Sequence, residues 1–227
     1  MAALTQQQLV EAGAHFGEAK RKWNPKMKQY IYTDRKGFHI IDLKQTAAMS
    51  SEFYEEIRSA AMKGDVLFVG TKKQASSIIK EQAEEAGMPY VSNRWLGGML
   101  TNLNTIKIRI KRLEELEKLF ESDDINLYTK KEQMLMKKEQ EKLDRFLGGI
   151  RNMPKTPSAI FVIDSIKEHN AIKEAKKLGI KVIGVADTDS NPEDFDVLLP
   201  ANDDAIKSIN LIVSFAAEAA KEGKASK

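Results

Sequence analysis

Aspartate side chains follow two strand-like apolar runs, and they have the clearest potential for catalysis. Asp164 ends the run 159–164, and Asp187 follows the run 181–186. Carboxylates beyond the ends of neighbouring parallel strands can hold Mg²⁺ or accept a phosphoryl group. Strand-terminal aspartates also commonly cap the helix or turn that follows. Because neither aspartate belongs to a fuller nucleophile motif, we favour capping and keep an Mg²⁺-dependent enzyme or phospho-acceptor as the alternative.

The other motifs that could do chemistry are incomplete. Residues 70–73, Gly-Thr-Lys-Lys, lack the second glycine and the Gly-Lys-Ser/Thr ending of a phosphate-binding loop, and no G-x-G-x-x-G or G-x-S-x-G stretch occurs. The histidines His15, His39 and His169 show no metal-ligand spacing. The absence of cysteine excludes disulfides, thiolate metal sites and cysteine nucleophiles. We therefore expect no cofactor, no metal site and no enzyme activity.

Basic residues grouped with aromatic rings are the remaining chemical signal. Guanidinium and ammonium groups bind phosphates, and an indole ring can stack on a base or brace an arginine. For tryptophan, packing in the core is the more common role. The groups are Lys20, Arg21, Lys22, Trp23 and Lys26; Arg94 and Trp95; and Lys107, Arg109, Lys111 and Arg112.

The elements that must position these residues follow from the apolar patterns. Unalternated apolar runs are typical of strands that are covered on both faces, as in parallel sheets. Such runs predict strands at 65–70, 159–164 and 181–186, with shorter ones at 89–91 and 197–199. Helical patterns lie between and around them, at 43–63, 74–86, 167–178 and 203–221. This alternation predicts a doubly wound α/β sheet. It is preceded by a short helix at 4–14 and a β-hairpin at 30–41, and residues 221–227 resemble a disordered tail.

Two helical segments rich in lysine and glutamate interrupt this alternation. Residues 104–120 and 131–147 each carry a narrow apolar stripe, and residues 122–126 between them are loop-like. Two narrow stripes joined by a short linker predict an antiparallel coiled-coil hairpin that projects from the globular body. We therefore expect an α/β sandwich made of residues 1–103 and 148–227, with the hairpin 104–147 inserted in it.

Charge is distributed unevenly, although the net charge of the 227 residues is only +3. The segment 15–36 holds seven bases and two acids, whereas 187–204 holds seven acids and no base. Such polarity suits a protein with one anionic partner. The alternative is that the two segments neutralise each other in the fold.

No membrane-spanning or export segment is expected. The apolar stretch 211–217 ends at Glu218 and is shorter than the roughly 20 residues that a bilayer requires. The first ten residues lack a basic segment followed by an apolar one. We expect a soluble, cytoplasmic protein.

Several ordered motifs are spread over almost the whole chain. They are Gly13-Ala-His-Phe-Gly17, Lys22-Trp-Asn-Pro-Lys-Met27, Ile40-Ile-Asp-Leu43, Phe68-Val-Gly-Thr-Lys-Lys-Gln74, Asn93-Arg-Trp-Leu-Gly-Gly98 with Leu100-Thr-Asn102, Phe146-Leu-Gly-Gly149 and Asn202-Asp-Asp-Ala-Ile206. In these motifs the chain resembles the second protein of the small ribosomal subunit, in its bacterial form. The resemblance implies a flavodoxin-like α/β/α sandwich with an inserted coiled-coil hairpin.

The resemblance also implies a function without catalysis. Members of this family bind small-subunit rRNA on the solvent side of the subunit, and they help to dock the large mRNA-binding protein. The implied partners are therefore rRNA and neighbouring ribosomal proteins, with no membrane and no homo-oligomer. The implied contact residues add Thr71, Lys72 and Lys73 to the basic groups above. A scaffold in which the acidic segment 187–204 meets a basic protein is compatible with this role.

Overall fold

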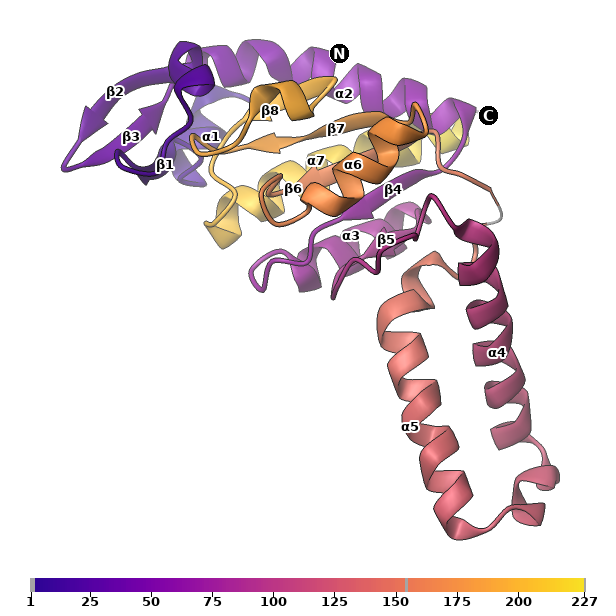
Figure 1. Ribbon diagram of the computed structural model, residues 1–227. Helices are drawn as coiled ribbons and strands as arrows, with labels where there is room; N and C mark the ends of the chain where they lie inside the picture. Colours follow the sequence, from indigo (N-terminus) through magenta and orange to yellow (C-terminus); the bar gives the residue numbers. More distant parts are fainter. Residues whose placement is uncertain (1–2, 154, 227) are drawn as a thin grey trace.

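The computed structural model describes residues 3–153 and 155–226, which form two sheets, their covering helices and a pair of long helices (Figure 1). The main sheet has five parallel strands in the order β5-β4-β6-β7-β8. Its strands are β4 (Val66–Val69), β5 (Tyr90–Val91), β6 (Ala159–Ile163), β7 (Lys181–Ala186) and β8 (Val197–Pro200). The order places the second strand of the sheet outside the first, as in a doubly wound flavodoxin-like α/β fold. The prediction of a parallel α/β sheet is confirmed.

Helices cover both faces of the main sheet, which explains its unalternated apolar strands. Successive strand residues point to opposite faces. Val66 and Phe68 are buried with α2 (Leu43–Lys63), α3 (Ser76–Ala86) and α7 (Ile206–Ala225), whereas Leu67 and Val69 are buried with α6 (His169–Lys177) on the other face. The buried positions on both sides of each strand must therefore be apolar.

A second, three-stranded antiparallel sheet lies at the N-terminus, in the order β1-β3-β2. Strands β2 (Ile31–Arg35) and β3 (Phe38–Ile41) form the predicted hairpin, and the turn residues Lys36 and Gly37 both have positive φ. Strand β1 (Phe16–Ala19) was not predicted, nor was the 3₁₀ helix η1 (Pro25–Tyr30). The predicted first helix is present as α1 (Gln6–Glu11), with a capping box between Thr5 and Gln8.

The helices α4 (Leu103–Glu121) and α5 (Lys130–Leu147) run side by side away from the sheets (Figure 1). The short 3₁₀ helix η2 (Asp123–Leu127) joins them, and a capping box between Thr129 and Glu132 starts α5. The 3₁₀ helix η3 (Gly148–Ile150) leads back to the main sheet, and η4 (Pro192–Asp194) lies between β7 and β8.

The end of the chain is helical, so the expectation of a disordered tail from residue 221 is wrong for the residues that the structure describes. Helix α7 continues to Ala225 because it packs closely against α2: a Cβ added at Gly223 would lie 2.3 Å from the carbonyl oxygen of Arg58. Lys224 Nζ also donates to the carbonyl oxygen of Gly87, 2.6 Å away. No helix in the described part of the chain is long and apolar enough to cross a membrane.

Gly149 joins the pair of long helices to the sheet through an unusually close contact. A Cβ at this position would lie 2.3 Å from the carbonyl oxygen of Tyr90, whereas a Cβ at Gly97 would meet no atom within 4 Å. We predict that Gly149→Ala lowers the free energy of unfolding by about 1–3 kcal/mol, since backbone must move to admit the methyl group. Gly97→Ala, the matched control, should change it by less than about 0.5 kcal/mol. Urea unfolding would measure both, and equal stability of the two variants would contradict the contact.

Candidate nucleic-acid interface

Hydrogen bonds attach the small N-terminal sheet to the carboxyl edge of the main sheet. Thr188, after β7, accepts the N–H of Glu18 at its hydroxyl (2.9 Å) and the N–H of Asn24 at its carbonyl (2.7 Å). Asn202, after β8, donates from its side-chain amide to the carbonyl of Phe16, 2.7 Å away. Because Thr188 and Asn202 are buried, these bonds fix the loop 20–24 beside that edge.

The basic residues of this loop are exposed, and acids within the chain neutralise only some of them. Lys20 pairs with Asp34 at 2.6 Å and Lys22 with Glu18 at 3.5 Å. Pairs this exposed are worth at most about 1 kcal/mol, so a phosphate can displace them. Arg21 is exposed and has no ion-pair partner among the described residues.

The acidic segment 187–204 meets the basic one at a single described ion pair, between Lys26 and Glu193. Its other charges bind elsewhere: Asp194 pairs with Lys176, and Asp196 accepts the backbone N–H of Val182. The two segments therefore neutralise each other only in part.

Trp23 is half-buried against His39, with the two ring centroids 5.2 Å apart. The indole therefore packs against the small sheet at β3. This position agrees with packing as the more common role of tryptophan.

Lys72 lies inside a group of carboxylates at the carboxyl edge of the main sheet. Its ammonium is 2.7 Å from Asp203, 2.5 Å from Asp204 and 3.5 Å from Asp164, and its side chain is only 15% exposed. Burial opposes its charge, but these carboxylates outweigh burial and raise the pKa of Lys72. The ammonium group is therefore neutralised by carboxylates within the fold and is not free to bind a phosphate.

Of the two neighbours of Lys72, Thr71 is bound within the fold and Lys73 is exposed. The backbone N–H and the hydroxyl of Thr71 both donate to buried Glu168, at 2.7 and 2.5 Å, and Lys167 donates to the carbonyl oxygen of Thr71. Burial raises the pKa of Glu168, although the hydrogen bonds from Thr71 act against it. Lys73 alone of the three predicted residues is exposed.

Five aspartates surround this edge: Asp164, Asp187, Asp189, Asp203 and Asp204, here called the carboxylate cluster. Burial and the charge of Asp203 raise the pKa of Asp187, and burial also raises the pKa of Asp189. Burial raises the pKa of Asp203 to about 7, with Lys72 pulling it down and Asp164 pushing it up. One largely enclosed ammonium thus faces several acids, and burial favours the protonated forms of Asp187, Asp189 and Asp203.

The carboxylate cluster lacks the arrangement of a catalytic metal centre. Within residues 3–153 and 155–226, no group of three or more His, Asp or Glu side chains is placed to hold a metal ion. Asp164 contacts Lys72, and Asp187 accepts the N–H of Thr188 at 2.5 Å. These contacts favour the structural role of both aspartates over the Mg²⁺-dependent alternative.

The Trp95 motif is organised around one carboxylate, Glu174 of α6. Its two oxygens accept hydrogen bonds from the indole N–H of Trp95 (3.0 Å), from the backbone N–H groups of Gly98, Leu100 and Thr101 (2.7–3.1 Å), and from the Thr101 hydroxyl (3.0 Å). Burial disfavours the ionised form, but these donors outweigh it and hold the pKa of Glu174 below its ordinary value. Trp95 is therefore buried and hydrogen-bonded to Glu174, whereas Arg94 beside it is exposed.

The bases of α4 are all exposed but do not share one face. Residues three or four apart lie together on a helix. Lys107 and Lys111 therefore form one pair, and Arg109 and Arg112 form another. Arg112 pairs with Glu139 of α5 at 3.1 Å, whereas Arg109 lines a hollow between α4 and α5 together with Lys142.

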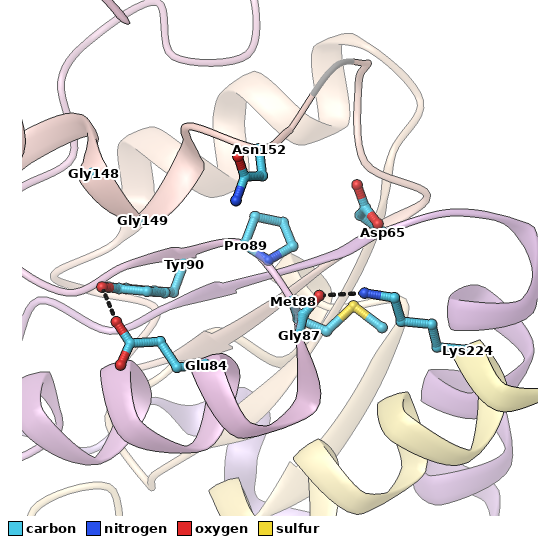
Figure 2. A pocket seen from close by; sticks show the side chains of 10 residues that line it. All are labelled: Asp65, Glu84, Gly87, Met88, Pro89, Tyr90, Gly148, Gly149, Asn152 and Lys224. Atoms are coloured by element: carbon cyan, nitrogen blue, oxygen red, sulfur yellow. Dashed lines mark hydrogen bonds between the residues drawn. The ribbon is translucent and has the colours of Figure 1, made fainter. Parts of the chain in front are cut away.

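Figure 2 shows another hollow, of about 470 Å³, at the amino ends of β4 and β5. Its polar groups bind one another: Tyr90 donates to Glu84 at 2.7 Å, and Lys224 donates to Gly87 at 2.6 Å. Asp65 and Glu84 add negative charge. These two carboxylates disfavour a phosphate in this hollow.

Residues 9–223 match the ribosomal protein S2 family. The match spans nearly all of the chain, so this protein belongs to the ribosomal protein S2 family, whose members are structural constituents of the small ribosomal subunit that serve translation.

Sequence reasoning missed the residues that hold these loops in place, above all Glu174 and Glu168. A signal for both was available. Ala171, Ile172 and Ala175 are the buried stripe of α6; Glu168 continues this stripe toward the amino end, and Glu174, three residues after Ala171, lies at its border. An acid on or beside an apolar stripe indicates a carboxylate that is removed from solvent and has dedicated hydrogen-bond donors.

We predict that Glu174→Gln lowers the free energy of unfolding at neutral pH by about 1–3 kcal/mol, because the new amide group would face N–H donors. Since the pKa of Glu174 is lowered in the fold, its contribution is complete above its ordinary value of 4.5 and is lost as the pH falls through the folded value. The deficit of the variant should therefore narrow below that pH. Exposed Glu81→Gln is the control, and an unchanged urea midpoint for Glu174→Gln would contradict the network.

The raised pKa of Asp203 predicts a stability that falls with increasing pH. The carboxyl group stays protonated in the fold up to about pH 7 but ionises near 3.8 when unfolded. Relative to Asp203→Asn, the wild type should lose about 1.4 kcal/mol per pH unit over that interval and then level off. Denaturant unfolding of both proteins from about pH 5 to 8 measures this difference. A difference that is independent of pH would show that the group is ionised throughout.

Proposed function

We propose that this protein binds rRNA of the small ribosomal subunit through exposed basic side chains on loops that its buried polar network holds rigid. The proposed phosphate contacts are Lys20, Arg21, Lys22, Lys26, Lys73, Arg94, Lys107, Arg109, Lys111 and Arg112. The observation that carries the proposal is the contrast at the carboxyl edge, where Lys72 is enclosed by carboxylates but Lys20, Arg21 and Lys22 stay exposed.

Four residues of the expected contact set are not among the proposed phosphate contacts. Lys72 is bound by aspartates, Thr71 by Glu168 and Trp95 by Glu174. Glu168 and Asp203 are buried and Glu174 is partly buried, so leaving these carboxylates without their donors would be costly. Trp23 contributes as a brace for the loop.

Helices α4 and α5 form a projecting arm, which we propose is a further part of the rRNA interface. We infer that residues 104–147 form a coiled-coil hairpin that is inserted into an α/β sandwich of residues 1–103 and 148–227. The buried side chains Ile106, Ile110 and Leu113 recur along one side of α4, as a narrow helical seam requires. The proposed bases Lys107, Arg109, Lys111 and Arg112 lie in the first turns of α4, so they extend the basic surface from the sheet onto the root of this arm.

Neighbouring proteins are the second proposed class of partner, including the large mRNA-binding protein of the small subunit. The small sheet exposes the aromatic rings of Phe16, Tyr32 and Phe38, with 51%, 73% and 51% of their surfaces accessible. Phe16 and Phe38 lie on the neighbouring strands β1 and β3, and contiguous exposed apolar surface marks interaction sites. The acidic segment is a weaker candidate, because its carboxylates bind Lys26, Lys176 and Lys72. We propose that the protein acts in the cytoplasm as a single copy per subunit, not as a homo-oligomer.

Reversing the loop charges tests the rRNA contact. The triple variant Lys20→Glu, Arg21→Glu, Lys22→Glu should lower occupancy on small subunits that lack the native protein by about tenfold or more, because three favourable phosphate contacts become repulsive. Sedimentation of the particles, followed by quantification of the bound protein, measures occupancy.

The control carries the same charge change at the opposite edge of the sheet. Lys63, Lys155 and Lys177 are exposed and precede β4, β6 and β7, so they lie at the amino ends of the strands. Lys63→Glu, Lys155→Glu, Lys177→Glu should bind nearly as wild type. Equal occupancy of the two triple variants would remove the loop 20–22 from the RNA interface.

A further inference from the structure

The root of the arm contains a hollow that the contacts above do not explain. It has a volume of about 380 Å³ and lies between α4, α5 and the loop 96–98. This volume is within the range of roughly 300–1,000 Å³ that is usual for small-ligand pockets, and it is far too small for a helix or a strand pair.

Apolar side chains form most of the walls of this hollow. Leu96, Leu143 and Phe146 line it, and all three are only half-buried although they pack against the core. Gly97 contributes bare backbone, since a Cβ there would meet no atom within 4 Å. A flat apolar group could therefore enter against the Phe146 ring without displacing the loop.

Two cations face the same hollow. Arg109 comes from α4 and Lys142 from α5, and neither has an ion-pair partner within the described ranges. The nearby base Arg112 differs, because Glu139 neutralises it. Two unneutralised charges beside an apolar cavity repel each other and favour an anionic occupant.

A polar side chain at the rim could read the edge of a flat ligand. Asn102 lines the hollow, and its side-chain oxygen accepts the hydroxyl of Thr105 at 2.9 Å. This bond orients the amide, so its N–H₂ group remains a donor; no acceptor for it occurs in the described part of the chain.

We propose that this hollow holds one unstacked nucleotide of the rRNA, with its base against Phe146 and Leu143 and its phosphate between Arg109 and Lys142. The inference rests on the proposed rRNA binding and names the form of RNA that this part of the interface takes. Single-stranded bases that are splayed out of a fold are commonly bound by stacking on an aromatic ring, with cations on the adjoining phosphate. An acidic peptide would satisfy the cations but leave the planar apolar walls poorly filled.

Nucleotide-resolution chemical probing of reconstituted small subunits tests the proposal. The full-length wild-type protein should protect one unpaired nucleotide that is reactive in subunits without it. The double variant Arg109→Glu, Lys142→Glu should bind about tenfold or more weakly and leave that nucleotide reactive even at saturating protein. The control Lys118→Glu, Lys138→Glu changes exposed lysines of the same two helices that do not line the hollow, and it should keep the protection.

Photocrosslinking gives a second readout that needs no variant. Irradiation of the wild-type complex, followed by mass spectrometry, should place a crosslinked nucleotide on the peptide that contains Phe146. Identical footprints for the two double variants, or a crosslink from this peptide to a protein neighbour, would overturn the nucleotide site while leaving rRNA binding intact. If the wild type protected no rRNA at all, the proposed function and this inference would both fail.

Discussion

The contact between Lys72 and the carboxylates of Asp164, Asp203 and Asp204 determines how this fold uses the carboxyl edge of its main sheet. In doubly wound sheets, ligands bind beyond the carboxyl ends of the strands. Here a buried ammonium and its aspartates occupy that position, and Thr188 and Asn202 use the rest of the edge to hold the N-terminal sheet. The place that would form an active site in an enzyme thus joins two parts of the molecule.

Polar side chains that are removed from solvent also hold loops in place elsewhere in the chain. Glu174 fixes the loop around Trp95 with five hydrogen bonds, and Glu168 fixes Thr71. Each network leaves an exposed base beside it, Arg94 in the first case and Lys73 in the second. A rigid loop loses little conformational entropy when its cation meets a phosphate. Buried Glu168 and partly buried Glu174 therefore support the proposed interface without touching RNA.

The sequence predicted the main sheet well because strands covered on both faces must be apolar throughout, as in 159–163. It did not predict β1, whose residues Phe16–Ala19 carry no apolar run and are ordered by pairing with β3. For the interface, the residue types showed where basic groups lie along the chain. They did not show which of these groups are exposed and which are neutralised by acids within the fold. Lys72 and Lys73 are neighbours of identical chemistry, and only tertiary contacts show that one is neutralised and the other exposed.

The salt dependence of binding tests the central claim most directly. Affinity of the purified protein for small subunits that lack it would be measured over a series of salt concentrations. If about six or more exposed bases contact phosphates, affinity should fall by about 10³-fold or more between 50 and 200 mM salt, because each contact releases counterions. An affinity that hardly changes over this range would show that phosphate contacts do not hold the protein in place, and it would contradict the account.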